Sequence, residues 1–102
     1  MASRAEQFAE LVRQQPGNAL FRFSLAQALL ADGRPADAVV HLEACAASRA
    51  DWMMPRILLG KALRQLGRGP EAKPVLTAAL DLAVAQQHED PERELRALLA
   101  EL

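Results

Sequence analysis

The chain contains one 34-residue unit written twice, and this repeat limits the possible folds more than any other feature. When the sequence is shifted by 34 residues against itself, identical residues coincide throughout residues 19–86. The coinciding pairs are Arg22/Arg56, Leu25/Leu59, Ala28/Ala62, Leu29/Leu63, Gly33/Gly67, Arg34/Arg68, Ala38/Ala72, Leu42/Leu76 and Ala44/Ala78. Periods of roughly 20–50 residues are typical of solenoids, in which each unit buries its apolar face against the next. The repeat therefore predicts a stack of similar units.

Each unit has the spacing of two amphipathic helices joined by a turn. Leu25 and Leu29 lie four residues apart, and so do Ala38 and Leu42, so each pair shares one face of a helix. Gly33 lies between the two pairs, and glycine is common just after the end of a helix. Tyrosine is absent and β-branched residues are few, which also favours helices over strands. The sequence predicts an all-α chain.

Start and stop signals place about six helices along the chain. We expect them over residues 3–14, 19–31, 35–48, 52–66 and 70–87, with a last helix starting at Asp90-Pro91-Glu92. Asn18 and Asp51 are expected to cap the second and fourth helices, since short polar side chains accept hydrogen bonds from the first helical N–H groups. Pro35 suits a first helical position. Pro74 falls inside the fifth helix, where we expect it to remove one early hydrogen bond.

Period, turn glycine and small residues together resemble the tetratricopeptide repeat (TPR) family, in the form of a small bacterial-type protein with two repeats. The family pattern reads W-x2-L-G-x2-Y, then A-x3-F, then P. The first copy reads Arg22-x2-Leu25-Ala26-x2-Leu29, Ala38-x3-Leu42 and Ala50, and the second Arg56-x2-Leu59-Gly60-x2-Leu63, Ala72-x3-Leu76 and Val84. Both copies carry arginine at the aromatic first position and lack the closing proline. The resemblance implies a right-handed α-α superhelix, a solenoid of helix-turn-helix repeats.

The same register divides the chain into one domain of four parts. Residues 1–18 form an N-terminal half-repeat helix, residues 19–52 the first repeat, residues 53–86 the second, and residues 87–102 a C-terminal capping helix. Two full copies with a half at each end approach the three repeats that such stacks need for stability.

Composition excludes several classes of function. The formal net charge of −1 removes the broad electrostatic case for binding nucleic acid or an anionic membrane. No stretch approaches the roughly 20 apolar residues of a membrane span. The early charges Arg4 and Glu6 argue against a secretory signal, and a single cysteine suits a reducing compartment. We expect a cytoplasmic protein without a cofactor.

Catalytic chemistry has little support in the sequence. His41 and Cys45 lie four residues apart and could share a metal, but a metal site needs three or four ligands, and His88 is far along the chain. Cys45 aligns with Ala79 of the next copy, which indicates a packing residue. A thiol or metal enzyme using His41 and Cys45 stays open as an alternative. The expectation is a non-enzyme with no catalytic or metal-binding residues.

The resemblance implies that the first helix of each repeat lines a concave groove for a peptide of a partner protein. The candidate peptide-binding residues are Leu20, Phe23, Gln27, Leu30, Trp52, Met54, Ile57, Lys61, Arg64 and Gln65. Phe23 and Ile57 could instead simply pack against the neighbouring helix. Lys61 and Arg64 form a small basic spot that could take a carboxylate, or they lie on a solvated helix face. A carboxylate clamp like that of chaperone-tail binders is not expected, because Phe23 and Gln27 occupy its Lys and Asn positions.

Self-association is the alternative function. Leu95, Leu98, Leu99 and Leu102 lie on one face of the last helix and could pair two chains into a weak homodimer. The sequence thus favours a protein–protein interaction module, with a self-associating scaffold subunit as the second hypothesis.

Overall fold

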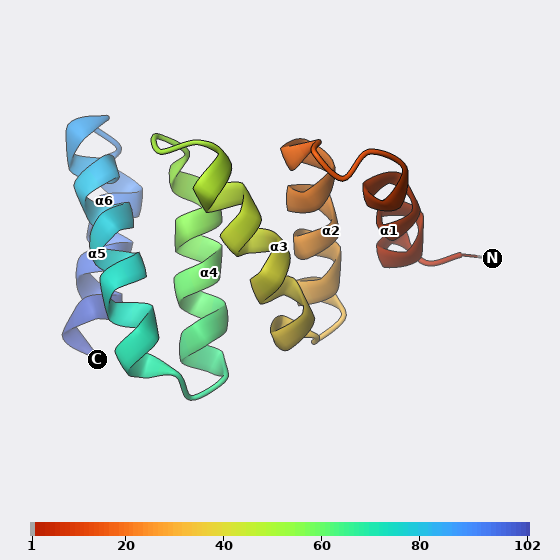
Figure 1. Ribbon diagram of the computed structural model, residues 1–102. Helices are drawn as coiled ribbons and strands as arrows, with labels where there is room; N and C mark the ends of the chain where they lie inside the picture. Colours follow the sequence, from red (N-terminus) through yellow and green to blue (C-terminus); the bar gives the residue numbers. More distant parts are fainter. Residues whose placement is uncertain (1) are drawn as a thin grey trace.

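The computed structural model describes residues 2–102, and these residues form six α-helices and no strand. The helices are α1 (Arg4–Gln14), α2 (Ala19–Ala31), α3 (Pro35–Ser48), α4 (Met53–Gln65), α5 (Gly69–Ala85) and α6 (Glu89–Ala100). Each helix packs against the next one along the chain. The stack measures 41 × 27 × 20 Å, and Figure 1 shows that the termini lie at its opposite ends. The all-α helical-repeat fold is confirmed, and the division into repeats stays a prediction.

The core consists of the positions that repeat in the sequence. Leucines of the first helix in each unit (Leu25, Leu29, Leu59 and Leu63) and residues of the second (Ala38, Leu42, Ala72 and Leu76) are all buried. Gly60 on α4 allows a close approach of α5, because a Cβ at this position would lie 2.2 Å from Leu76 Cδ2. The periodic apolar residues therefore face inward, as their spacing predicts.

Local signals fix most of the helix starts. Ser3 and Glu6 form a capping box at α1, in which each side chain receives the backbone N–H of the other residue. Asn18 Oδ1 accepts from Phe21 N at 3.1 Å, so the predicted cap of α2 is confirmed. Pro35 begins α3, where its missing N–H costs no hydrogen bond.

Two predicted starts were wrong. Trp52, not Asp51, is the N-cap residue of α4, and neither α4 nor α6 has a side-chain cap. The Asp51 carbonyl instead accepts from Gln86 Nε2 at 2.9 Å. Helix α6 starts at Glu89, one residue earlier than expected, with His88 as its N-cap. Extended backbone at the cap and packing behind it are sufficient to start these helices.

Pro74 lies inside α5 without ending it. The helix is continuous from Gly69 to Ala85, although the missing N–H of Pro74 removes one bond of the ladder. Ala72, Leu76 and Ala79 are fully buried on either side of this position. Tertiary packing of this face therefore holds the helix across the proline.

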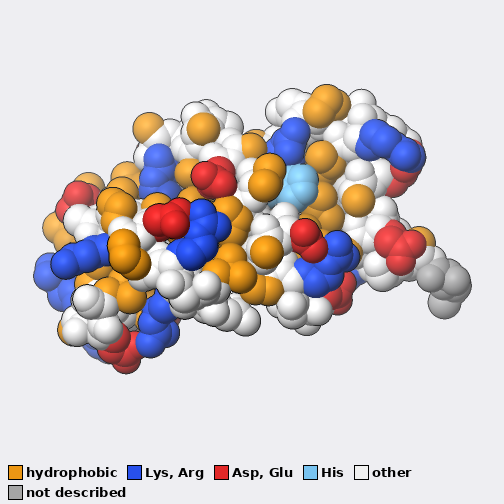
Figure 2. All heavy atoms as spheres, turned by 60° about the horizontal axis from the view of Figure 1, so that its bottom comes forward, with side chains coloured by type: hydrophobic (Ala, Val, Ile, Leu, Met, Phe, Trp, Pro, Cys, Tyr) orange, Lys and Arg blue, Asp and Glu red, His pale blue; other side chains and the backbone are white. Residues whose placement is uncertain are grey.

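Charges of both signs are mixed on the surface. Figure 2 shows acidic and basic side chains next to one another, with apolar side chains between them. Exposed pairs one turn apart account for some of these contacts, among them Arg34–Asp37 and Arg68–Glu71. No broad area of one sign covers the face shown there, in keeping with the net charge of −1.

Candidate functional site

Helices α2, α4 and α6 share one face of the stack, called here the α2–α4–α6 face. The rings of Phe23 on α2 and Trp52 at the start of α4 have centroids 5.1 Å apart, tilted by 47°. Both rings are half-buried. Aromatic pairs at such distances and angles add stability beyond the area they bury. The contact therefore joins the two helices and leaves part of each ring at the surface.

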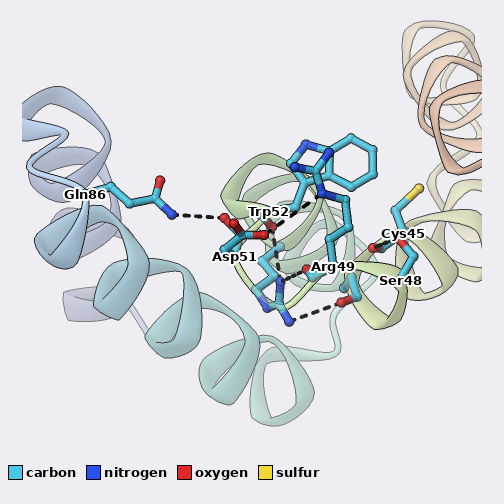
Figure 3. A network of polar contacts seen from close by, with 8 residues as sticks. Cys45, Ser48, Arg49, Asp51, Trp52 and Gln86 are labelled. Atoms are coloured by element: carbon cyan, nitrogen blue, oxygen red, sulfur yellow. Dashed lines mark hydrogen bonds and ion pairs between the residues drawn. The ribbon is translucent and has the colours of Figure 1, made fainter.

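Trp52 also contacts a cation. The Arg49 guanidinium carbon lies 5.7 Å from the indole centroid, and Figure 3 shows this side chain over the ring. In the same view Gln86 reaches across from the end of α5 to Asp51. Trp52 thus contacts both Arg49 and Phe23 within the chain, which restricts its orientation before any partner binds.

Helix α6 supplies acidic partners to both basic residues predicted on α4. Lys61 pairs with Glu94, and Arg64 pairs with Glu101. All four side chains are between 43% and 57% exposed, so each pair contributes only about 0–1 kcal/mol to stability. These pairs matter more for binding than for stability. Lys61 and Arg64, the predicted basic spot, are already paired with carboxylates of the chain itself.

A small cavity of about 260 Å³ lies between α4 and α6. Its lining residues are Met54, Ile57, Leu58, Lys61, Asp90, Pro91 and Glu94. Apolar side chains from both helices thus meet three charged ones. The cavity includes predicted residues and borders the exposed Met54, so we take it as part of the candidate site.

A larger cavity of about 450 Å³ lies between α1, α2 and α3. Its apolar lining includes Leu25, Leu29 and Val40, and its charged residues Arg34 and Asp37 pair with each other at 2.8 Å. None of the predicted binding residues lines it. This cavity therefore lies outside the surface formed by the predicted residues.

The structure separates the ten predicted residues by exposure. Leu20, Gln27, Met54, Lys61, Arg64 and Gln65 are exposed, whereas Phe23, Leu30 and Trp52 are half-buried. Ile57 is only 4% exposed and belongs to the core, so the packing interpretation holds for this residue. The nine others keep side-chain surface that a partner could contact.

Sequence reasoning missed the contribution of α6 to this face. Asp90, Pro91 and Glu94 line the cavity, although the last helix was expected to cap the stack or to pair two chains, and not to contribute to the peptide-binding face. The repeat period could have indicated this role of α6. First helices begin at residues 19 and 53, so a third one is expected near residue 87, and α6 begins at residue 89.

Cys45 and His41 both form contacts within the helix packing. Cys45 is fully buried, its Sγ donates to the Ala19 carbonyl at 3.4 Å, and burial raises the pKa of its thiol. Arg22 Nη1 lies 3.1 Å from His41 Nδ1, and the pKa of His41 is lowered by burial and then by this guanidinium. Within residues 2–102, no three His, Cys, Asp or Glu side chains gather as a metal site requires. A buried thiol with a raised pKa is poorly suited to nucleophilic chemistry.

The leucines of the last helix mostly face the chain's own core. Leu95 is fully buried, and Leu98 and Leu99 are half-buried against the core. Leu102 is the most exposed of the four, at 37%. The face proposed for self-association is therefore largely used within the chain.

Comparison with curated proteins finds a relative in Pseudomonas aeruginosa that is described as a TPR repeat-containing protein. It is 33% identical over 92 residues, which cover 90% of this chain. Over nine tenths of its length, this chain is therefore similar to part of a TPR repeat-containing protein. The match spans 15% of the relative's length, so most of that protein lies outside the comparison. No family model matches, and no solved structure gives a significant match.

Arg22 and Arg56 stand where the family pattern has an aromatic residue, and the structure shows the contacts of each. Arg22 Nε donates to the Pro16 carbonyl at 2.9 Å. Arg56 Nη1 donates to the carbonyls of Arg49 and Trp52, and its Nη2 donates to Ala46, all between 3.1 and 3.2 Å. Each guanidinium therefore holds the loop before its own helix with hydrogen bonds, and Arg56 does so with three, more than the single indole N–H of a tryptophan could donate.

Within residues 2–102, no helix combines the length and the apolar character that crossing a bilayer requires.

Proposed function

We propose that this chain is a non-catalytic protein–protein interaction module that holds a peptide segment of a partner on the α2–α4–α6 face. The name of the TPR relative supports an interaction module in general. A free cysteine buried in the core suits a reducing compartment, so we also propose a cytoplasmic location.

The observation that carries the proposal is the exposed apolar surface on this face. Leu20 is 63% exposed and Met54 is 42% exposed, while Phe23 and Trp52 are half-buried. Aromatic and methionine side chains are frequent anchors at protein interfaces. Because Arg49 and Phe23 restrict the orientation of Trp52, binding costs less side-chain entropy there.

The size of the face limits the affinity. Only three helices contribute to it, so we expect dissociation constants for a single peptide in the micromolar range (about 1–100 μM), unless several sites act together.

The experiment compares capture by two double variants with the wild type. Leu20→Glu/Met54→Glu places two charges on the proposed face. Val40→Glu/Val84→Glu changes two other exposed apolar residues, 63% and 48% exposed, and serves as the matched control. Partner proteins are captured from a lysate of the source organism, and the bound segment is then mapped with overlapping synthetic peptides.

We expect the first variant to lose a peptide that the wild type and the control retain. Circular dichroism must show the same helical content for all three proteins. If the control loses the peptide and the Leu20/Met54 variant retains it, the binding surface lies elsewhere and the proposal fails.

A further inference from the structure

We infer that the cavity between α4 and α6 takes a basic side chain of the partner peptide, a lysine or an arginine, rather than an acidic one. The inference rests on the proposed function and names the chemistry of its partner. It reverses the expectation drawn from Lys61 and Arg64 in the sequence.

The interior of the cavity is suited to an aliphatic stem. Met54, Ile57, Leu58 and Pro91 contribute its apolar lining. Its volume of about 260 Å³ is below the range of about 300–1,000 Å³ typical of small-molecule pockets, so it suits one long side chain. Lysine and arginine bury their methylene stems along apolar surface while the charged end stays near water.

The charged residues of the cavity leave an excess of negative charge. One cation, Lys61, is set against two carboxylates, Asp90 and Glu94, which gives a net charge of −1. Lys61 is already paired with Glu94. Asp90 has a weaker partner, since its carboxylate lies 3.9 Å from Arg93 and the two side chains are 94% and 80% exposed. The Asp90 carboxylate is therefore available to a cation.

An acidic side chain would meet the opposite situation. It would have to displace Glu94 from Lys61, or Glu101 from Arg64, before it gained an ion pair of its own. In doing so it would also leave a carboxylate of α6 without its partner. Like charges brought together at an interface weaken binding and discriminate against the wrong partner.

The test uses peptides selected from a random 12-residue display library against the complete wild-type chain. Selected peptides whose binding is lost in Leu20→Glu/Met54→Glu are synthesised in two forms, with each basic residue retained or replaced by glutamate. Affinities are measured by fluorescence polarisation. Asp90→Lys is compared with Asp81→Lys, which changes net charge equally at an exposed acidic position on α5.

We expect lysine or arginine to be enriched in the selected peptides, and the glutamate forms to bind about five-fold more weakly or worse. Asp90→Lys should abolish this preference, whereas Asp81→Lys should preserve it. Enrichment of acidic residues, or equal affinity of both forms, overturns the inference but leaves the proposed function intact. If no selected peptide depends on Leu20 and Met54, the proposed function fails as well.

Discussion

At the scale of single residues, the turn before α6 contains a backbone conformation that glycine would adopt more easily. Gly33, Gly67 and Gln87 have φ values of 72°, 76° and 58°. The hydrogen bonds match as well, because the N–H groups of Gln87 and His88 bond to carbonyls three and five residues back, as at the two glycine turns. A non-glycine residue in the left-handed region costs about 1–2 kcal/mol.

We therefore expect Gln87→Gly to raise the free energy of unfolding by up to about 1 kcal/mol, since release of the strain outweighs the greater freedom of glycine in the unfolded chain. Gly67→Ala should have the opposite effect and lower it by about 1 kcal/mol, because open space around Gly67 leaves backbone strain as the main cost. Urea denaturation followed by circular dichroism measures both. A destabilised Gln87→Gly protein would show that this turn is not strained.

His41 predicts a dependence of stability on pH. Its folded-state pKa is lowered from 6.5 by burial and by Arg22, while Asp37 opposes the shift. Between the lowered value and 6.5 the unfolded chain binds a proton that the folded chain does not, so stability falls as the pH drops through this window. In His41→Gln this part of the decline, which lies below pH 6.5, should disappear. Equal pH slopes for the two proteins in denaturant titrations would contradict the assignment.

At the scale of helices, the packing of α4 on α5 depends on the absence of a side chain at Gly60. A Cβ there would lie 2.2 Å from Leu76 Cδ2, and Leu76 is fully buried, so it has little room to move. The first repeat carries Ala26 at the equivalent position, so the two repeats pack with different separations or side-chain positions.

We expect Gly60→Ala to destabilise the protein by about 1–3 kcal/mol through overpacking, despite the better helix propensity of alanine. In a Leu76→Ala background the same change should be neutral or stabilising, because the clashing atoms are gone. A double-mutant cycle from denaturation curves measures this coupling. Additive effects would mean that the clash is relieved elsewhere.

At the scale of the whole molecule, stability is distributed unevenly along the stack. Helix α1 buries only Ala5 and Val12, and α6 only Leu95, whereas α4 buries seven residues between two neighbours. End helices of a repeat stack lack one neighbour and so open more readily than inner ones.

Native-state hydrogen exchange should therefore show amides of α1 and α6 exchanging about ten-fold faster or more than those of α4 and α5. Ser3→Ala, which removes the cap of α1, should accelerate α1 alone. Uniform protection from α1 to α6 would show that the stack opens only as one unit.

How much could be predicted from the sequence differs between fold and site. The helices and the core could be predicted from periodicity, because apolar residues at helical spacing, such as Leu42 and Leu76, are expected to face the core. Asn18 and Pro35 start helices through local contacts and local backbone geometry, so their roles could also be predicted from the sequence. Asp51 was wrong as a cap, because α4 starts at Met53 and Trp52 is its N-cap residue.

The candidate site shows the same limit. The sequence by itself determined the helical repeat and the turns, since these depend on local spacing, and its resemblance to the TPR family directed attention to α2 and α4. Only the tertiary structure decided that Ile57 is buried and that Glu94 and Glu101 pair with Lys61 and Arg64. Ion pairs and exposure depend on which surfaces meet in space, and residues more than 30 apart in the chain meet here through packing alone.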